Sequence, residues 1–123
     1  NSPRDAISRL ETIALMGSVN LPVLAVRTQI VNAIDLIVHM DRLTDGSRKI
    51  VSITEIPRME GELVTSSEIF RFEQSGIGPD GEVQGQLVST GLRPIFSDRM
   101  EIAGYHLRSE LFLKGSQKRG HRR

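Results

Sequence analysis

Apolar side chains recur every three or four residues at the start of the chain, a spacing that predicts two amphipathic helices. Ser2 is placed to cap the first helix, Pro3 suits its first turn, and Gly17 is expected to close it in a left-handed conformation. The second helix is expected to begin near Pro22. The apolar positions are Ala6, Ile7, Leu10, Ile13 and Ala14 in the first helix, and Val23, Val26, Ile30, Ala33 and Ile34 in the second.

The pattern then changes to short runs rich in β-branched residues, which predict strands. The run at 36–40 is typical of a buried strand. Asp45-Gly46 predicts a tight turn into a second strand at 50–56, and Pro57 is expected to end that strand. These elements form a first hairpin.

A second hairpin is predicted further along the chain. A short strand at 62–65 precedes a longer one at 68–73, which carries Phe70 and Phe72 on one face. Pro79-Asp80-Gly81 forms the turn, and 82–88 returns as the partner strand. Gly85 weakens this last strand or marks a bulge.

A linker at 90–94 leads to a third helix expected over 94–103 and ended by Gly104. An apolar cluster follows, made of Leu107, Leu111, Phe112 and Leu113. The predicted organisation is a helical pair at 1–34, hairpins at 35–89, a helical segment at 90–113 and a tail at 114–123. The order of elements, helices first and hairpins after them, indicates an α+β arrangement within this piece.

Composition limits the possible classes of protein. The chain has 123 residues, the size of one domain, and it lacks cysteine, which excludes disulfides and thiolate metal sites. No apolar run approaches the roughly 18 to 20 residues of a spanning helix, so we do not expect a transmembrane protein. The chain begins with Asn1, and we expect a cleaved, trimmed or partial sequence.

The net charge of +1 conceals an uneven distribution of charge. Residues 1–113 carry eleven basic and fifteen acidic side chains, whereas the tail carries five basic ones: Lys114, Lys118, Arg119, Arg122 and Arg123. An acidic body argues against a dedicated nucleic-acid binder. The tail is expected to be a flexible, solvated terminus, with contact to nucleic acid or anionic lipid as the alternative.

Catalytic motifs are absent from this sequence. It contains no G-x-x-x-x-G-K-[ST] phosphate loop and no G-x-G-x-x-G fingerprint. His39, His106 and His121 lack the spacing of metal ligands, and His39 is expected to be structural. By its own chemistry the chain is not a self-sufficient enzyme, and we expect neither a catalytic residue nor a metal site within it.

A colinear set of short motifs nevertheless resembles the type II and type IV secretion ATPases, and most closely their CpaF-like branch, which serves Tad/Flp pilus assembly. The opening Asn1-Ser2-Pro3-Arg4-Asp5-Ala6 is similar to the segment that begins two residues after the histidine of that family's histidine box. The remaining motifs are Leu21-Pro22, 34–39, 45–49, 52–56, 59–62, 69–73, Thr90-Gly91-Leu92-Arg93-Pro94 and Leu111-Phe112. Pro57-Arg58 departs from the family pattern, and the basic tail is not part of it.

The resemblance implies the C-terminal part of an α/β, RecA-like P-loop ATPase domain. Such a motor assembles as a homo-hexamer and hydrolyses ATP with Mg²⁺. Such a motor is cytoplasmic and works at the inner membrane, against a platform protein of the secretion or pilus machine. Its Walker A, Walker B and box histidine would all precede Asn1, so this chain alone is expected to be inactive.

The resemblance also suggests site residues. Asn1, Ser2 and Arg4 would lie near the nucleotide, although a helix cap and a surface charge are the simpler interpretations of Ser2 and Arg4. Arg42 and Arg48 are candidates for a subunit interface, with cross-strand pairing to Asp41 or Asp45 as the stronger expectation. Arg93 in the linker is a third interface candidate.

Two other classes remain open. The chain could be a stand-alone interaction module with a basic tail, which would bury its own core, whereas a piece of a motor should leave an exposed edge of a parallel sheet. A small β-rich nucleic-acid binder would need stacking aromatic side chains on a basic face, which the acidic body does not offer.

Overall fold

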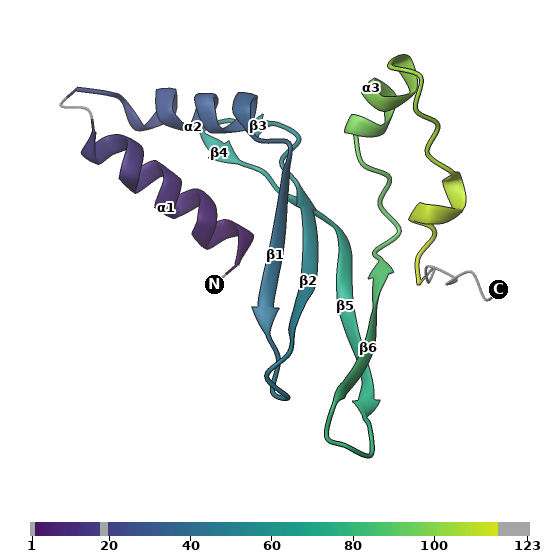
Figure 1. Ribbon diagram of the computed structural model, residues 1–123. Helices are drawn as coiled ribbons and strands as arrows, with labels where there is room; N and C mark the ends of the chain where they lie inside the picture. The colour runs from purple at the N-terminus through teal and green to yellow at the C-terminus, as the bar shows by residue number, and fades with distance from the viewer. Residues whose placement is uncertain (1, 18–19, 116–123) are drawn as a thin grey trace.

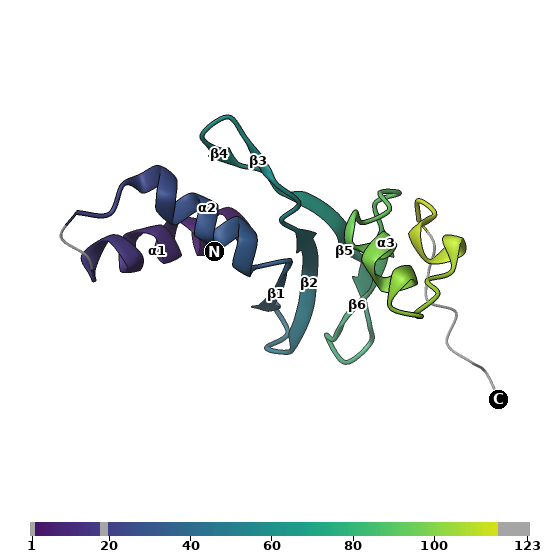
Figure 2. The same cartoon turned by 90° about the horizontal axis from the view of Figure 1, so that it is seen from above.

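The computed structural model describes residues 2–17 and 20–115. The chain forms a helical pair, a central sheet and a C-terminal segment, which lie side by side in that order (Figures 1 and 2). The elements are α1 (Pro3–Met16), α2 (Val23–Ala33), β1 (Leu36–Arg42), β2 (Arg48–Glu55), β3 (Met59–Glu60), β4 (Leu63–Val64), β5 (Ser67–Ile77), β6 (Val83–Ser89), α3 (Phe96–Ile102) and the 3-10 helix η1 (Ser109–Phe112). The mixed α+β composition expected from the sequence is confirmed.

The two N-terminal helices form where the pattern predicts them. The Ser2 hydroxyl accepts a hydrogen bond from the Asp5 amide at 3.2 Å, and Pro3 is the first helical residue. Gly17 ends α1, but its φ of −83° and ψ of −4° are right-handed, so the left-handed conformation expected there is wrong. The Gly17 amide still reaches the Ile13 carbonyl at 3.3 Å, so the helix ends without a reversal of handedness.

One buried seam and one ion pair join α1 to α2. Ile7, Val26 and Ile30 are buried, whereas Ile13 at 66% exposure faces solvent. Arg27 donates from Nε to Glu11 at 2.9 Å and from a terminal nitrogen to the Glu62 carbonyl at 3.0 Å. Arg27 therefore links both helices to the β3–β4 hairpin.

The central sheet has four strands in the order β1-β2-β5-β6, and every pairing among the described strands is antiparallel. Gly46 has a φ of +84° in the β1–β2 turn and Gly81 a φ of +80° in the β5–β6 turn, which confirms both predicted turns. A piece of a motor is expected to expose an edge of a parallel sheet. The described sheet is antiparallel, so that expectation is wrong about the kind of sheet.

β1 is an edge strand, and the expectation that it is buried is wrong. Leu36, Val38 and Met40 are 39%, 52% and 58% exposed. The physical reason is that strand side chains alternate between the two faces of a sheet, and the face that carries Leu36, Val38 and Met40 is left uncovered.

The hairpins number three within the described residues, rather than the two expected. β3 and β4 form an additional short hairpin, with Gly61 at a φ of +58° between them. It projects from the sheet beside α2 (Figure 2). The strand expected at 62–65 is thus the second half of this small unit.

β5 and β6 form the longest hairpin, and Phe70 and Phe72 lie on one face as predicted. The pairing is irregular between Gln74 and Gly76, directly opposite Gly85. A bulge therefore exists, although the extra residue belongs to β5.

The C-terminal segment extends beyond the end of β6 and then returns to it, where the Gly115 amide donates to the Ser89 carbonyl at 3.0 Å. α3 begins two residues later than expected, and Gly104 ends it with a φ of +93°. The expected apolar cluster is only partly formed: Phe112 is buried against Phe70, with ring centroids 6.0 Å apart, while Leu113 is 59% exposed. The short 3-10 geometry of η1 turns only one of these side chains inward.

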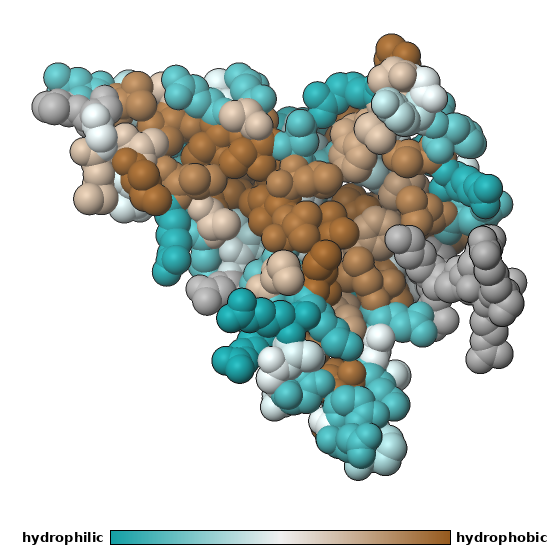
Figure 3. Space-filling view, viewed as in Figure 1, coloured by the Kyte–Doolittle hydropathy of each residue, from teal (hydrophilic) through white to brown (hydrophobic). Residues whose placement is uncertain are grey.

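Apolar side chains reach the surface in a broad band. The band runs from the helical pair across the upper part of the sheet, while the hairpin tips are hydrophilic (Figure 3). Within residues 2–17 and 20–115, no helix combines the length and apolar character required to cross a membrane. Residues 116–123, most of the basic tail, lie outside the described residues.

Candidate functional site

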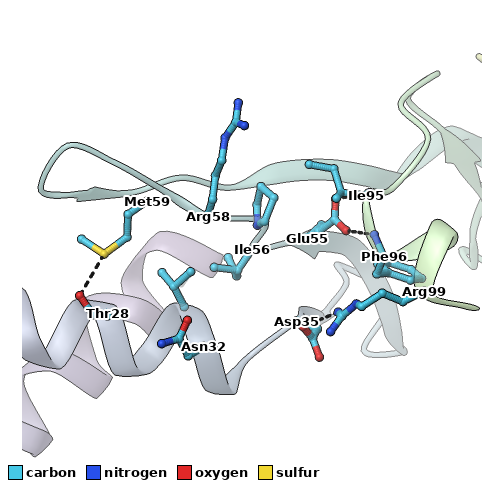
Figure 4. Close-up of a pocket in the computed structure, with 12 residues that line it drawn as sticks. Thr28, Asn32, Asp35, Glu55, Ile56, Arg58, Met59, Ile95, Phe96 and Arg99 are labelled. Carbon is cyan, nitrogen blue, oxygen red and sulfur yellow. Dashed lines mark hydrogen bonds and ion pairs between the residues drawn. The ribbon is translucent and has the colours of Figure 1, made fainter.

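A cleft of about 450 Å³ lies where α2, the end of β2, β3 and α3 meet. Its apolar lining comes from Val31, Ile56, Pro57, Met59, Ile95 and Phe96, and its polar lining from Thr28, Asn32, Asp35, Glu55, Arg58 and Arg99. Figure 4 shows these side chains arriving from segments far apart in the sequence. The fold, rather than any local motif, creates this site.

Glu55 is the most constrained polar side chain of the cleft. It is 4% exposed, and its two carboxylate oxygens accept hydrogen bonds from the amides of Ile95 and Phe96, each at 2.9 Å. These amides open α3, where the helix leaves its first N–H groups without backbone partners. The carboxylate therefore caps α3 from a strand that lies 40 residues earlier in the chain.

A second contact joins α3 to the other wall. Arg99 donates to the Asp35 carboxylate at 2.8 Å, and these side chains are 68% and 60% exposed. The Asp35 carbonyl accepts the Ile56 amide at 3.0 Å, which fixes Asp35 beside the floor of the cleft. The ion pair thus lies at the solvent-facing side of the site.

The remaining polar lining groups include a hydroxyl and a guanidinium. Thr28 donates to the Leu24 carbonyl at 2.9 Å and also approaches the Met59 sulfur at 3.5 Å. Arg58 points away from the other lining side chains (Figure 4). The lining includes no histidine, lysine or serine, and its two carboxylates are already engaged by the α3 amides and by Arg99.

The nucleotide-proximal candidates lie at the start of α1. Asn1 lies outside the described residues. Ser2 forms the helix cap, as the simpler interpretation held, and Arg4 is exposed on the first turn. Neither residue lines the cleft.

Arg42 and Arg48 face each other at the end of the β1–β2 hairpin. Arg42 donates from Nε to the Gly46 carbonyl at 3.3 Å. The expected pairing with Asp41 or Asp45 is wrong, because Asp41 accepts the Arg42 backbone amide and Asp45 accepts Ser47 and Val83. Two like charges therefore occupy directly opposed, exposed positions.

Arg93 makes its contacts within the C-terminal segment. It donates from Nε to the Ser97 hydroxyl at 3.1 Å, lies 3.6 Å from the Glu101 carboxylate, and stacks 5.5 Å from the Phe112 ring centroid. These contacts fasten the linker to both α3 and η1. Arg93 therefore has an evident structural role in addition to the interface role suggested for it.

The structure does not bring the suggested residues together. The start of α1 lies on the β1 side of the sheet, the β1–β2 turn lies at one end of it, and the linker after β6 lies on the far side (Figure 1). They do not form a single site within this chain.

Asp45 is a second carboxylate with a long-range role. It accepts the Val83 amide at 2.7 Å and the Ser47 hydroxyl and amide at 2.6 and 2.8 Å. The Ser47 hydroxyl, followed by the Val83 amide, lowers the pKa of Asp45 to about 2. Asp45 thereby ties the tip of the first hairpin to the start of β6.

The described residues do not gather the side chains that a metal site needs. Residues 2–17 and 20–115 contain no group of three or more histidine, aspartate or glutamate side chains arranged to hold an ion. His106 lies 3.1 Å from Glu101 and forms a local pair on the surface.

Sequence reasoning missed Glu55, Asp35 and Arg99 as members of one site. A usable signal existed for Glu55, because a carboxylate that closes an apolar strand needs partners when buried. Asp35 and Arg99 are separated by 64 positions, and no local pattern links them. Neither a protein-family model nor a curated protein matches this chain.

Proposed function

We propose that this chain is the C-terminal part of a RecA-like secretion or pilus ATPase motor. The proposal rests on the colinear motifs from Asn1 to Phe112 and on one structural observation, the uncovered edge of β1. In this proposal the parent protein forms a homo-hexamer at the cytoplasmic face of the inner membrane. The ring would act on a platform protein of the machine.

The free edge of β1 carries this proposal. The Asp35 carbonyl accepts the Ile56 amide, and the Leu43 amide donates to the Ser47 carbonyl. Because hydrogen-bonded pairs alternate in an antiparallel ladder, the backbone groups of Leu36, Val38, Met40 and Arg42 point away from β2. Three of these four residues also expose apolar side chains.

A free edge on a strand of seven residues, three of which expose apolar side chains, is costly for an isolated domain, because it invites pairing with other strands. Such an edge is expected where further sheet from the same domain normally covers it. The rest of a RecA-like sheet would supply that cover.

ATP and Mg²⁺ do not fit the residues described here. The chain lacks a phosphate loop, and the described residues offer no acidic cluster for the ion. Glu55 is already bound to two amides, and Arg99 is paired with Asp35. In the proposed parent, phosphate binding and hydrolysis therefore belong to elements outside this chain.

An assay of hydrolysis tests the proposal directly. The purified 123-residue chain should release no phosphate from ATP and bind ATP only feebly. A longer protein with a phosphate loop upstream should hydrolyse ATP as a ring. Robust hydrolysis by the 123-residue chain alone would contradict the proposal.

Arg4 provides the residue-level test in the longer protein. Arg4→Ala should lower ring-dependent hydrolysis without lowering the unfolding midpoint, because Arg4 is exposed on α1. Arg9→Ala, an exposed change on the same helix, is the matched control. Equal activity of both variants would remove Arg4 from the nucleotide site.

The alternative function is a stand-alone interaction module with a basic tail. The same exposed apolar residues of β1 favour it, since uncovered apolar surface often marks a binding site. The sequence directly upstream of Asn1 separates the two proposals. A phosphate loop and an acidic box there support the motor, and a start codon immediately before Asn1 supports the module.

A further inference from the structure

α3 forms one wall of the cleft, and its attachment differs between its two ends. Ile95, Phe96 and Arg99 face the cleft, and the opposite wall comes from α2 and the segment after β2. Any movement of α3 relative to the sheet therefore changes the width of the cleft.

The N-terminal end of α3 is firmly held. The Glu55 carboxylate is buried and binds the Ile95 and Phe96 amides together. Pro94 and Ser97 on either side are also fully buried. Hydrogen bonds to a charged and desolvated acceptor are among the stronger contacts of a protein, so this end acts as a fixed point.

The C-terminal end of α3 is lightly held. Ile102 is 88% exposed, and Gly104 follows at a φ of +93° with open space where a side chain would lie. From this half of the helix, Glu101 lies 3.6 Å from the partly exposed Arg93 of the linker. The far wall is reached through the Arg99–Asp35 ion pair, in which both side chains are more than half exposed. Exposed ion pairs are weak and are screened by salt.

We propose that α3 is a gate over the cleft, with its pivot at Glu55 and its latch at the Arg99–Asp35 ion pair. The latch closes the cleft at low ionic strength, and its release allows the C-terminal half of α3 to swing away from α2. Access to the apolar floor at Ile56 is then controlled by a pair of surface charges.

The absence of cysteine in the chain permits a clean test. Ile56→Cys places one thiol on the floor, at a position that is 3% exposed and hydrogen-bonded to Asp35. The rate at which a disulfide reagent such as dithiobis(nitrobenzoate) labels this thiol reports how often the cleft opens. Arg99→Gln in this background should raise the rate about two- to five-fold, the range expected for one exposed pair.

Matched controls separate a gate from general unfolding. Arg108→Gln removes an exposed charge outside the cleft and should leave the labelling rate unchanged. Val83→Cys places a thiol at a buried position at the other end of the sheet, and its rate should not respond to Arg99→Gln. In the Ile56→Cys background, the double variant Asp35→Arg with Arg99→Asp, which swaps the two charges, should restore slow labelling. Addition of 1 M NaCl to Ile56→Cys should raise the labelling rate as Arg99→Gln does.

Two outcomes would overturn the gate. One is an unchanged Ile56→Cys rate after Arg99→Gln, and the other is an equal increase at Ile56→Cys and Val83→Cys. If Ile56→Cys does not fold, Val31→Cys on the opposite wall provides the second probe. Because Val31 is only half-buried, its rate should rise by a smaller factor after Arg99→Gln, and an unchanged rate would overturn the gate.

Discussion

Two carboxylates connect parts of this molecule that are distant in sequence. Asp45 in the first hairpin turn accepts the amide of Val83, 38 positions later. Glu55 accepts the first two amides of the α3 region, about 40 positions later. Each contact satisfies backbone donors that have no strand or helix partner, so each fixes the position of one segment against another.

Asp45 should make stability depend on acid pH. Its folded pKa is lowered to about 2 from the usual 3.8, so its contribution is present above about pH 4 and is lost as the pH falls toward 2. The urea midpoint of the unmodified chain should therefore fall more between pH 4.5 and pH 2.5 than that of Asp45→Asn. Asp80→Asn, at the exposed tip of the other hairpin, should behave as the unmodified chain does. A carboxyl shift of Asp45 that titrates near 3.8 by NMR would contradict this expectation.

Glu55→Gln should destabilise the fold by about 1 to 3 kcal/mol, because a buried amide donor then faces an NH₂ group instead of an oxygen. Urea unfolding measures the loss. Glu68→Gln on β5 is the control, since that side chain is exposed and should change stability by less than about 0.5 kcal/mol. A Glu55→Gln variant as stable as the control would show that α3 does not depend on this cap.

At the scale of elements, the β5–β6 hairpin leaves no room for a side chain at Gly85. A Cβ at Gly85 would lie 2.4 Å from the Glu73 carbonyl oxygen and 2.5 Å from a ring carbon of Phe72. Gly85→Ala should therefore cost about 1 to 3 kcal/mol, as overpacked sites do. Gly76→Ala, with no atom within 4 Å of the added carbon, is the matched control. Urea unfolding measures this loss as a lower midpoint for Gly85→Ala than for Gly76→Ala. Equal midpoints would show that the hairpin accommodates the added methyl group without loss of stability.

The elements that could be predicted are those governed by local chemistry. The Ser2 cap, the Gly46 and Gly81 turns and the end of α3 at Gly104 follow from short-range geometry, and the structure has them where the sequence places them. The exposure of β1 could not be predicted, because an apolar run has the same sequence whether or not other elements cover the outward face of its strand. The cleft could not be predicted either, since its walls are joined by pairs such as Asp35 and Arg99 that only the folded chain brings together.

At the scale of the whole molecule, the hydrophobic core is small and divided. One part lies between α1 and α2 around Val26, and another lies along the sheet around Ile69 and Val88. Meanwhile β1 leaves apolar side chains and unpaired backbone groups on one edge. A chain of this kind gains stability when another strand covers that edge, whether the strand belongs to a longer parent or to a second copy.

Val38 at the centre of β1 tests this idea. Val38→Lys places a charge on the free edge, which opposes strand pairing by desolvation and repulsion. Because Val38 is 52% exposed, the change should cost less than about 1 kcal/mol of stability. Sedimentation at rising concentration should show the unmodified chain associating and Val38→Lys remaining monomeric. Ile77→Lys, at a 61% exposed position of β5 away from that edge, should associate as the unmodified chain does. If Val38→Lys and Ile77→Lys associate equally, the edge of β1 is not the surface that drives association, and the main structural support for a covered sheet is lost.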